Sequence, residues 1–267
     1  MLYSGHAYFM AKEKKNKKKL LLWLLLTPVA LFLILVITFK IYTASYYRAN
    51  NEIISRIEVL LNNKVSSYKD KNGTVFIPKN QEIRAVIVFY PGGKVEYTAY
   101  SSLMLELASK GYVCLLPKMP DNLAFLKIDA VESLTKPYKE ETDTVKNLDW
   151  YLAGHSLGGV AAATYLKDQD TFKGLILCAS YTPTDFSDSD IRLLSIYGSN
   201  DKVLNMDSYK EYRENWPKDS REYVINGGIH SYFGSYGIQD GDGEPGITNQ
   251  EQIQETADVI NAWITQK

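Results

Sequence analysis

Apolar residues along the chain gather into short continuous runs, separated by longer segments with helical spacing. Eight such runs, rich in β-branched and aromatic side chains, predict strands. Most of them lack the polar residue at every second position that a half-exposed strand shows, and this is typical of a parallel sheet that is buried on both faces. The runs cover residues 65–68, 74–77, 85–90, 112–116, 150–153, 174–179, 193–197 and 222–225.

The segments between these runs predict helices. The last of them starts with Thr248 and Glu251 at capping-box spacing and places Ile253, Ala257 and Ile260 on one face. Strands that alternate with helices need crossover connections, so the chain is predicted to form an α/β domain with a mostly parallel central sheet flanked by helices. The helices are expected over residues 98–110, 128–134, 157–167, 207–215 and 249–265, and an apolar stripe in residues 50–63 predicts either a further short helix or a simple spacer.

Residues 20–39 form an uncharged run of twenty residues, directly after six lysines within residues 12–19. A helix of this length crosses about 30 Å of hydrocarbon, and spanning helices tolerate a proline such as Pro28. A cleaved signal peptide is the alternative, but its apolar core would be about 7 to 15 residues long, and residues 42–45 make a poor cleavage site. We therefore predict one N-terminal transmembrane anchor over residues 20–41.

The orientation of this anchor follows from its flanking charges. The lysine cluster on its amino side outweighs Lys40 and Arg48 on the other side. The positive-inside rule therefore predicts a single-pass protein of the cell membrane, with a cytoplasmic N-terminus and an extracytoplasmic domain.

This interpretation divides the chain into four parts. We expect a basic cytoplasmic segment over residues 1–19, the anchor, a juxtamembrane linker over residues 42–63 and a globular domain over residues 64–267. Met10 is an alternative start, because the residues before it belong neither to the basic cluster nor to the apolar run.

Charge and cysteine content restrict the classes of partner and cofactor. The first fifty residues hold eight of the 30 basic residues and one of the 31 acidic residues, so the rest of the chain is acidic by eight charges. This balance argues against nucleic acid as a partner. Two cysteines exclude a disulfide-built scaffold, and without a CxxC pair or a histidine-rich cluster we expect neither a metal nor a cofactor.

The candidate chemistry lies in the sequence GHSLGG at residues 154–159, between a predicted strand and a predicted helix. The pattern G-x-S-x-G at such a turn is typical of a nucleophile elbow, in which a strained backbone lifts the serine hydroxyl clear of the sheet. Ser156 is therefore the candidate nucleophile. The alternative is a glycine-rich turn with an incidental serine.

A serine nucleophile needs a base, and the chain has three histidines. His6 precedes the membrane span, and the side chain of His155 points away from its neighbour's hydroxyl, which leaves His230 after the last predicted strand. Asp201, after the preceding strand, is the candidate acid that orients it. The backup acids are Asp185, Asp188 and Asp190, while Asp207 is better interpreted as a helix cap.

Backbone N–H groups must also stabilise the oxyanion that forms on the substrate. Leu157, which follows the nucleophile at a helix start, is one candidate donor. The second should come from the loop with the sequence PGGK at residues 91–94, where we favour Gly93 and keep Lys94 as the alternative. A phosphate-cradling loop is a weaker interpretation, because no GK[ST] follows.

The segments FYPGGKV, GYVCLLPKMPDNLAF, GHSLGG, YGSNDKV and GGIHSYFGSYG, in this order and spacing, resemble the α/β-hydrolase superfamily. Residues 64–267 are most similar to its small, lidless members related to dienelactone hydrolases. The resemblance implies a Ser156, Asp201 and His230 triad with Gly93 and Leu157 as the oxyanion hole. Dienelactone hydrolases proper use a cysteine nucleophile, so lactone specificity does not carry over.

The resemblance also implies how far apart the two cysteines lie and which residues form the walls of the pocket. Its strand order separates Cys114 from Cys178 by two strands, about 14 Å at ~4.8 Å per strand, which is too far for a disulfide. The eleven residues 180–190 are too few for an inserted lid. We therefore expect pocket walls from residues 119–125, Tyr181 and the aromatic residues Tyr232, Phe233 and Tyr236.

Together these features predict a membrane-anchored serine hydrolase that cleaves small carboxylic esters through an acyl-enzyme. The alternatives are an acyltransferase or peptidase with the same triad, or a catalytically silent binding domain. An intact set of Ser, His and Asp disfavours the silent domain. The alternating carboxylates of residues 240–244 could hold calcium, although a solvated acidic turn is the simpler interpretation.

Overall fold

The computed structural model describes residues 3–134 and 147–266, and it divides into two units. The first unit, Met1–Ser45, contains one helix, α1 (Tyr3–Ala44), with Pro28 inside it. Its stretch Leu22–Ala44 is long and apolar enough to cross a membrane. This stretch overlaps the predicted span of residues 20–41. The first two residues of the predicted basic segment lie outside the described residues.

The second unit, Tyr46–Lys267, is built on a sheet of eight described strands in the order β1-β2-β4-β3-β5-β6-β7-β8. β1 and β2 form an antiparallel hairpin, and β2 pairs antiparallel with β4, while all other neighbours are parallel. The mostly parallel sheet is thus confirmed. The strands are β1 (Val65–Lys69), β2 (Gly73–Pro78), β3 (Ala85–Tyr90), β4 (Tyr112–Pro117), β5 (Asp149–His155), β6 (Phe172–Cys178), β7 (Arg192–Gly198) and β8 (Ser220–Ile225).

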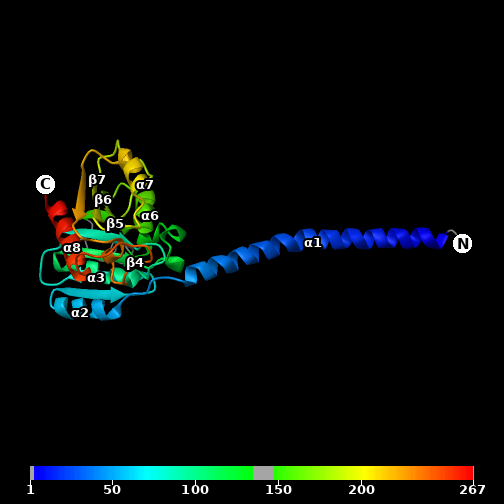
Figure 1. Cartoon of the computed structure of the whole chain (residues 1–267), viewed down its shortest axis with the longest axis horizontal. Helices are drawn as coiled ribbons and strands as arrows, with labels where there is room; N and C mark the ends of the chain where they lie inside the picture. Colours follow the sequence, from blue (N-terminus) through cyan, green and yellow to red (C-terminus); the bar gives the residue numbers. More distant parts are fainter. Residues whose placement is uncertain (1–2, 135–146, 267) are drawn as a thin grey trace. The chain divides into compact units, whose positions relative to one another are not determined.

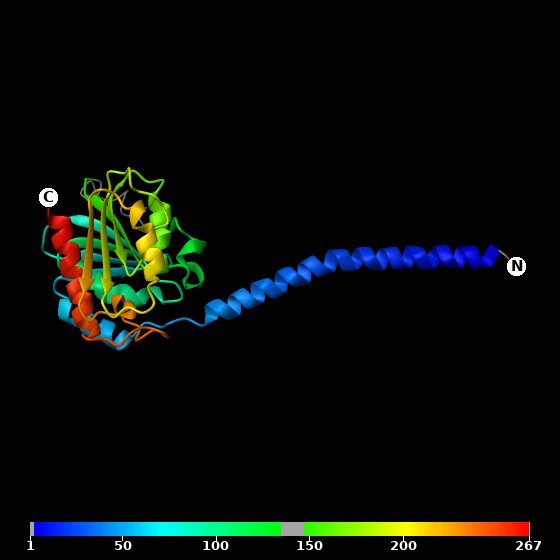
Figure 2. The same cartoon turned by 45° about the horizontal axis from the view of Figure 1, so that its top comes forward.

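Helices cover both faces of this sheet, as Figures 1 and 2 show for α3 and α8 on one side and α6 on the other. Alternate residues of the central strand β3 serve the two layers: Ile87 and Phe89 pack under α3 and α8, whereas Val88 packs under α6. Such two-sided burial explains the continuous apolar runs. The helices are α2 (Asn51–Leu61), α3 (Ser101–Ser109), α6 (Leu157–Leu166), α7 (Met206–Glu211) and α8 (Asn249–Thr265).

Helix ends follow their capping chemistry. The capping box of Thr248 and Glu251 starts α8 as the spacing indicates. The start of α7 corrects the interpretation of Asp207, because the cap is Asn205, whose side chain accepts hydrogen bonds from the N–H groups of Asp207 and Ser208. A 3-10 turn, Tyr97–Tyr100, takes the place of the expected first helical turn before α3.

The predicted linker differs from the structure. Residues 46–61 belong to the second unit, because α2 packs its apolar stripe on the core and Ile57 is buried there. The folded unit therefore starts at Tyr46 instead of residue 64.

The two cysteines lie on β4 and β6, with β3 and β5 between them. Both are free and buried. They act as small apolar side chains of the core.

Candidate active site

The candidate residues follow the carboxyl ends of neighbouring parallel strands. Ser156 follows β5, residues 91–94 follow the adjacent β3, Asp201 comes after β7 and His230 after β8. β4 lies on the outer side of β3, and β6 lies on the outer side of β5, so the chain winds in opposite directions from this point of the sheet. Open α/β sheets bind their ligands at such a switch point.

Ser156 has the backbone of a strained turn, with φ 52° and ψ −126°. A non-glycine residue rarely adopts such a positive φ, and only firm surroundings maintain it. Its N–H donates to the Cys178 carbonyl at 3.0 Å, and its own carbonyl accepts the Ser180 hydroxyl at 2.7 Å. Glycine is required next to this turn, because a Cβ on Gly158 would lie 2.2 Å from the Pro91 carbonyl oxygen.

His230 and Asp201 form a buried pair. His230 Nδ1 lies 2.9 Å from Asp201 Oδ2, and the two side chains are only 1% and 2% exposed. The other carboxylate oxygen accepts the N–H groups of Val203 at 2.9 Å and Leu204 at 2.8 Å. A carboxylate held in this way places the ring proton on Nδ1 and leaves a lone pair on Nε2.

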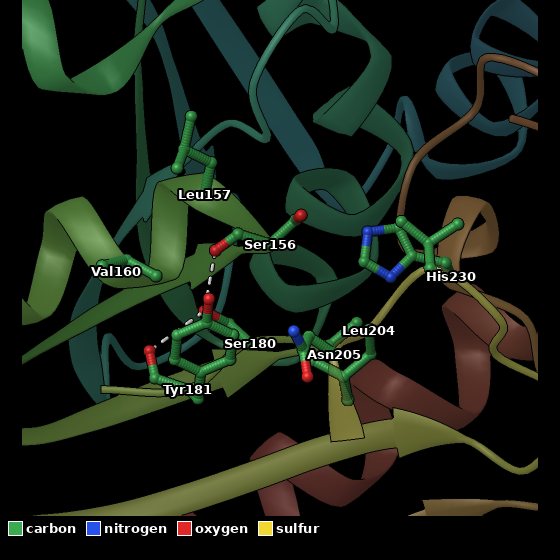
Figure 3. A pocket seen from close by; sticks show the side chains of 10 residues that line it. Ser156, Leu157, Val160, Ser180, Tyr181, Leu204, Asn205 and His230 are labelled. Atoms are coloured by element: carbon green, nitrogen blue, oxygen red, sulfur yellow. Dashed lines mark hydrogen bonds between the residues drawn. The ribbon is translucent and has the colours of Figure 1, made fainter. Parts of the chain in front are cut away.

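The ring nitrogen of His230 that is not bonded to Asp201, Nε2, faces the pocket. Nε2 is buried and finds no hydrogen-bond partner among the described residues. Figure 3 shows the Ser156 hydroxyl pointing toward the His230 ring across this pocket. The arrangement suits a base that takes the proton of a serine during attack on a bound carbonyl.

The pocket itself has a volume of about 150 Å³. Beside Ser156 and His230 it is lined by Tyr181, as expected, and by Val160, Leu204 and Asn205, which the sequence analysis missed (Figure 3). Residues 203–205 reach the pocket because Asp201 folds the start of their loop back through its two backbone hydrogen bonds.

The expected aromatic wall after His230 is wrong. Phe233 and Tyr236 are buried in the core, where Phe233 packs on the His155 ring with a centroid distance of 5.6 Å and Tyr236 packs on Tyr47 at 5.7 Å. Neither they nor Tyr232 nor residues 119–125 line the described pocket. We call residues 226–248, between β8 and α8, the histidine loop. The buried rings of Phe233 and Tyr236 attach this loop to the core.

The two candidate oxyanion donors on the β3 loop differ in their existing bonds. The Lys94 N–H already donates to the Asn122 carbonyl at 2.8 Å, while the Gly93 N–H has no acceptor among the described residues. Gly93 also lies against the nucleophile turn, since a Cβ there would come within 2.8 Å of Leu157 Cδ2. The Leu157 N–H, at the first position of α6, likewise has no acceptor within the described part of the chain. Gly93 is therefore the better candidate.

His155 has a structural place below the site. Its Nδ1 lies 2.8 Å from the Tyr100 hydroxyl and its Nε2 lies 3.1 Å from the His230 carbonyl oxygen. Burial, with a smaller effect of His230, lowers the pKa of His155 well below its usual value, so the ring is neutral. Tyr100 then donates to Nδ1, and Nε2–H donates to the carbonyl. His155 is thus committed to these two partners.

Asp242 is a residue that the sequence analysis assigned no role in this site. Its carboxylate accepts the N–H of His230 at 3.2 Å, and the N–H and hydroxyl of Ser231 at 2.8 and 2.5 Å. These bonds fix the turn that carries His230. Among the described residues there is no cluster of three or more His, Cys, Asp and Glu side chains that could hold a metal.

The backup acids lie elsewhere. Asp185 accepts the N–H and hydroxyl of Ser187 in the β6–β7 loop. Neither Asp188 nor Asp190 has a described contact with His230, and Asp201 alone among the candidate acids bonds its ring.

A model of the alpha/beta hydrolase family matches residues 86–254, from β3 into α8. The matched region contains Gly93, Ser156, Leu157, Asp201 and His230. No curated protein matches the chain.

Proposed function

The chain belongs to the alpha/beta hydrolase family, and from this premise we propose that it is a membrane-anchored serine hydrolase that cleaves small carboxylic esters. The observation that carries the proposal is the buried 2.9 Å contact between His230 and Asp201, with the second ring nitrogen unbonded among the described residues and the Ser156 hydroxyl pointing toward this ring (Figure 3). A nucleophile, a base and an acid that orients the base are the parts that acyl transfer through a serine requires.

The proposed reaction has two halves. Ser156 Oγ attacks the ester carbonyl carbon while His230 Nε2 takes the hydroxyl proton, and the Asp201 carboxylate stabilises the imidazolium. The N–H groups of Gly93 and Leu157 donate to the oxyanion of the tetrahedral intermediate. The carbon–oxygen bond to the leaving group then breaks, and His230 gives its proton to the departing alcohol. A water molecule then attacks the acyl carbon of the acyl-enzyme while His230 takes its proton. The bond to Ser156 Oγ breaks as His230 returns that proton to the serine, which releases the acid and free Ser156.

The membrane part of the proposal rests on α1. The apolar stretch Leu22–Ala44 follows the lysine cluster, and this order favours a cytoplasmic N-terminus with the hydrolase unit outside the cell. We assign residues 1–19 to the cytoplasm and residues 20–41 to the anchor.

A fluorophosphonate probe tests the mechanism, because it phosphonylates a serine that a neighbouring base activates. We expect the full chain to be labelled at Ser156, as mapped by peptide mass spectrometry, and the Ser156→Ala variant to stay unlabelled. Ser187→Ala is the matched control and should be labelled like the wild type, because the Ser187 hydroxyl donates to Asp185 in an outer loop and contacts neither Asp201 nor His230 among the described residues. Labelling at another serine, or none, would refute the proposal.

A further inference from the structure

The segment that joins the folded unit to the apolar helix runs alongside the candidate oxyanion loop. We call residues 46–50 the exit segment. The Tyr47 N–H donates to the Lys94 carbonyl at 2.8 Å, and the Glu96 N–H donates to the Tyr47 carbonyl at 2.9 Å. The two hydrogen bonds form a parallel bridge between Tyr47 and Val95. Lys94 directly follows Gly93, so the exit segment is bonded to the residue next to a proposed oxyanion donor.

The same segment also bonds the loop that carries His230. The Tyr47 hydroxyl accepts the N–H of Asp240 at 3.0 Å, and its ring packs on Tyr236. The Asn50 N–H donates to the Ser235 carbonyl at 2.8 Å. One short stretch therefore connects the oxyanion loop with the histidine loop, which come from opposite ends of the folded sequence.

The backbone of Lys94 shows why such support is needed. Lys94 has a φ of 58°, a left-handed conformation that is unfavourable for a residue with a Cβ. Strained residues of this kind persist only where their neighbours determine them. Asn122 holds the N–H of Lys94 and Tyr47 holds its carbonyl. The peptide that precedes Lys94 joins it to Gly93, so a change of φ at Lys94 has to be absorbed by the backbone of Gly93, whose N–H is the proposed oxyanion donor.

We propose that Tyr47 is a positioning residue of the hydrolase site. It fixes the oxyanion loop and the histidine loop in their positions relative to each other. This inference rests on the proposed function. Tyr47 touches no reacting atom, and it acts through Lys94 on one side and through Asp240 and Tyr236 on the other. The residue where the folded unit joins its anchor is thereby also a part of the active-site scaffold.

Three substitutions in the full-length, membrane-extracted protein separate the contacts of Tyr47. Tyr47→Phe keeps the ring and the backbone bonds and loses only the acceptor for Asp240. Tyr47→Ala loses the ring as well, and Tyr47→Pro also loses the N–H that holds Lys94. The control is Tyr46→Ala: Tyr46 lies 5.0 Å from the Arg48 guanidinium carbon and bonds neither loop within the described residues.

The test is to measure, for the wild type and each variant, kcat and KM for p-nitrophenyl acetate, the rate of fluorophosphonate labelling and the melting temperature. We expect kcat to fall about threefold in Tyr47→Phe, about tenfold in Tyr47→Ala and about a hundredfold in Tyr47→Pro, as successive hydrogen bonds and contacts are removed. KM should change less than about twofold, because the contacts act on the transition state. Tyr46→Ala should match the wild type.

The outcomes are distinguishable. A folded Tyr47→Pro variant with wild-type kcat, or an equal loss in Tyr46→Ala, overturns the positioning role while wild-type labelling at Ser156 still supports the hydrolase. If Tyr47→Pro does not fold, Tyr47→Ala decides by the same criterion. Absence of labelling in the wild type overturns both the proposed function and the inference.

Discussion

Replacement of Asp242 by asparagine tests how the histidine of the site is held. Asp242 is half-buried, and its carboxylate bonds the backbone of His230, Ser231 and Gly243. The amide oxygen of asparagine can keep the bonds of one carboxylate oxygen. Its NH2 group then faces the Ser231 N–H, so that two donors meet and a buried N–H loses its acceptor.

The size of the effect follows from that one lost bond. A hydrogen bond to a charged group contributes about 1.5–3 kcal/mol, and a buried group without a partner costs about 1–3 kcal/mol. We expect the turn that carries His230 to lose about 2 kcal/mol of stability. If the conformation in which His230 can react is destabilised by this full amount, kcat drops about thirtyfold, at 1.4 kcal/mol per factor of ten. KM stays nearly unchanged.

The assay compares kcat for p-nitrophenyl acetate with the melting temperature of each variant. Asp240→Asn is the matched control, since it makes the same charge change two residues away at an exposed side chain. The control should keep wild-type kcat. A folded Asp242→Asn variant whose kcat falls less than about threefold, or a control whose kcat falls as much as that of Asp242→Asn, would show that the Asp242 carboxylate does not hold His230 in its reactive position.

Three further predictions concern the triad, the oxyanion loop and the anchor. Ser156→Ala and His230→Ala should each remove nearly all ester hydrolysis while keeping the fold, and the double variant should be no worse, because triad members act as one unit; a folded single variant with most of its activity speaks against the triad. Gly93→Pro should lower kcat about a hundredfold relative to Gly93→Ala, with little change in KM, because both variants add a Cβ against Leu157 but only proline has no N–H to donate; equal kcat in the two folded variants would assign the donor elsewhere. Protease added to intact cells should digest the unit beyond Tyr46, and the protein should stay in the membrane pellet after a high-salt wash; a soluble form that starts near Ser45 would instead indicate a cleaved signal.

The sequence predicts most of the fold, because burial on two faces leaves a clear pattern. All eight predicted strands occur within a few residues of their expected bounds, and β3 agrees at both ends. The helix α8 also agrees at both ends, where its capping box sets the start. These elements are specified by local patterns of apolar residues and by capping side chains, which can be recognised without knowing the tertiary contacts.

The features that were missed depend on contacts between distant backbone groups. Asp242 is one of several carboxylates in its loop, and only the folded turn shows that it accepts the N–H of His230. The bridge of Tyr47 to the oxyanion loop is one residue long and therefore has no periodicity. Phe233 follows the candidate base in the sequence, but the turn directs its ring into the core. None of these three contacts leaves a mark in the composition of the chain or in the spacing of its apolar residues.

Under the proposed function, the length of acyl chain that the site accepts depends on the loop where other hydrolases carry a lid. β6 ends at Cys178 and β7 begins at Arg192, and residues 179–191 between them contain no helix. The pocket beside Ser156 holds about 150 Å³. Each methylene that stays in water forgoes about 0.8 kcal/mol of burial, so the gain in transition-state binding should end once the chain leaves this pocket.

We therefore expect kcat/KM for p-nitrophenyl esters to peak between acetate and butyrate. We also expect no activation by detergent micelles, because there is no helical lid in the β6–β7 loop to open. The measurement is kcat/KM across a series from two to sixteen carbons, with the full-length protein below and above the critical micelle concentration of one detergent. Val160→Ala removes two methyl groups from the pocket wall beside Ser156 and so enlarges the pocket. The acyl-chain length with the highest kcat/KM should then increase. A wild-type maximum at twelve carbons or more would require a hydrophobic groove beyond the pocket, and the exposed side chains of Phe125 and Leu126 would then be the first to test.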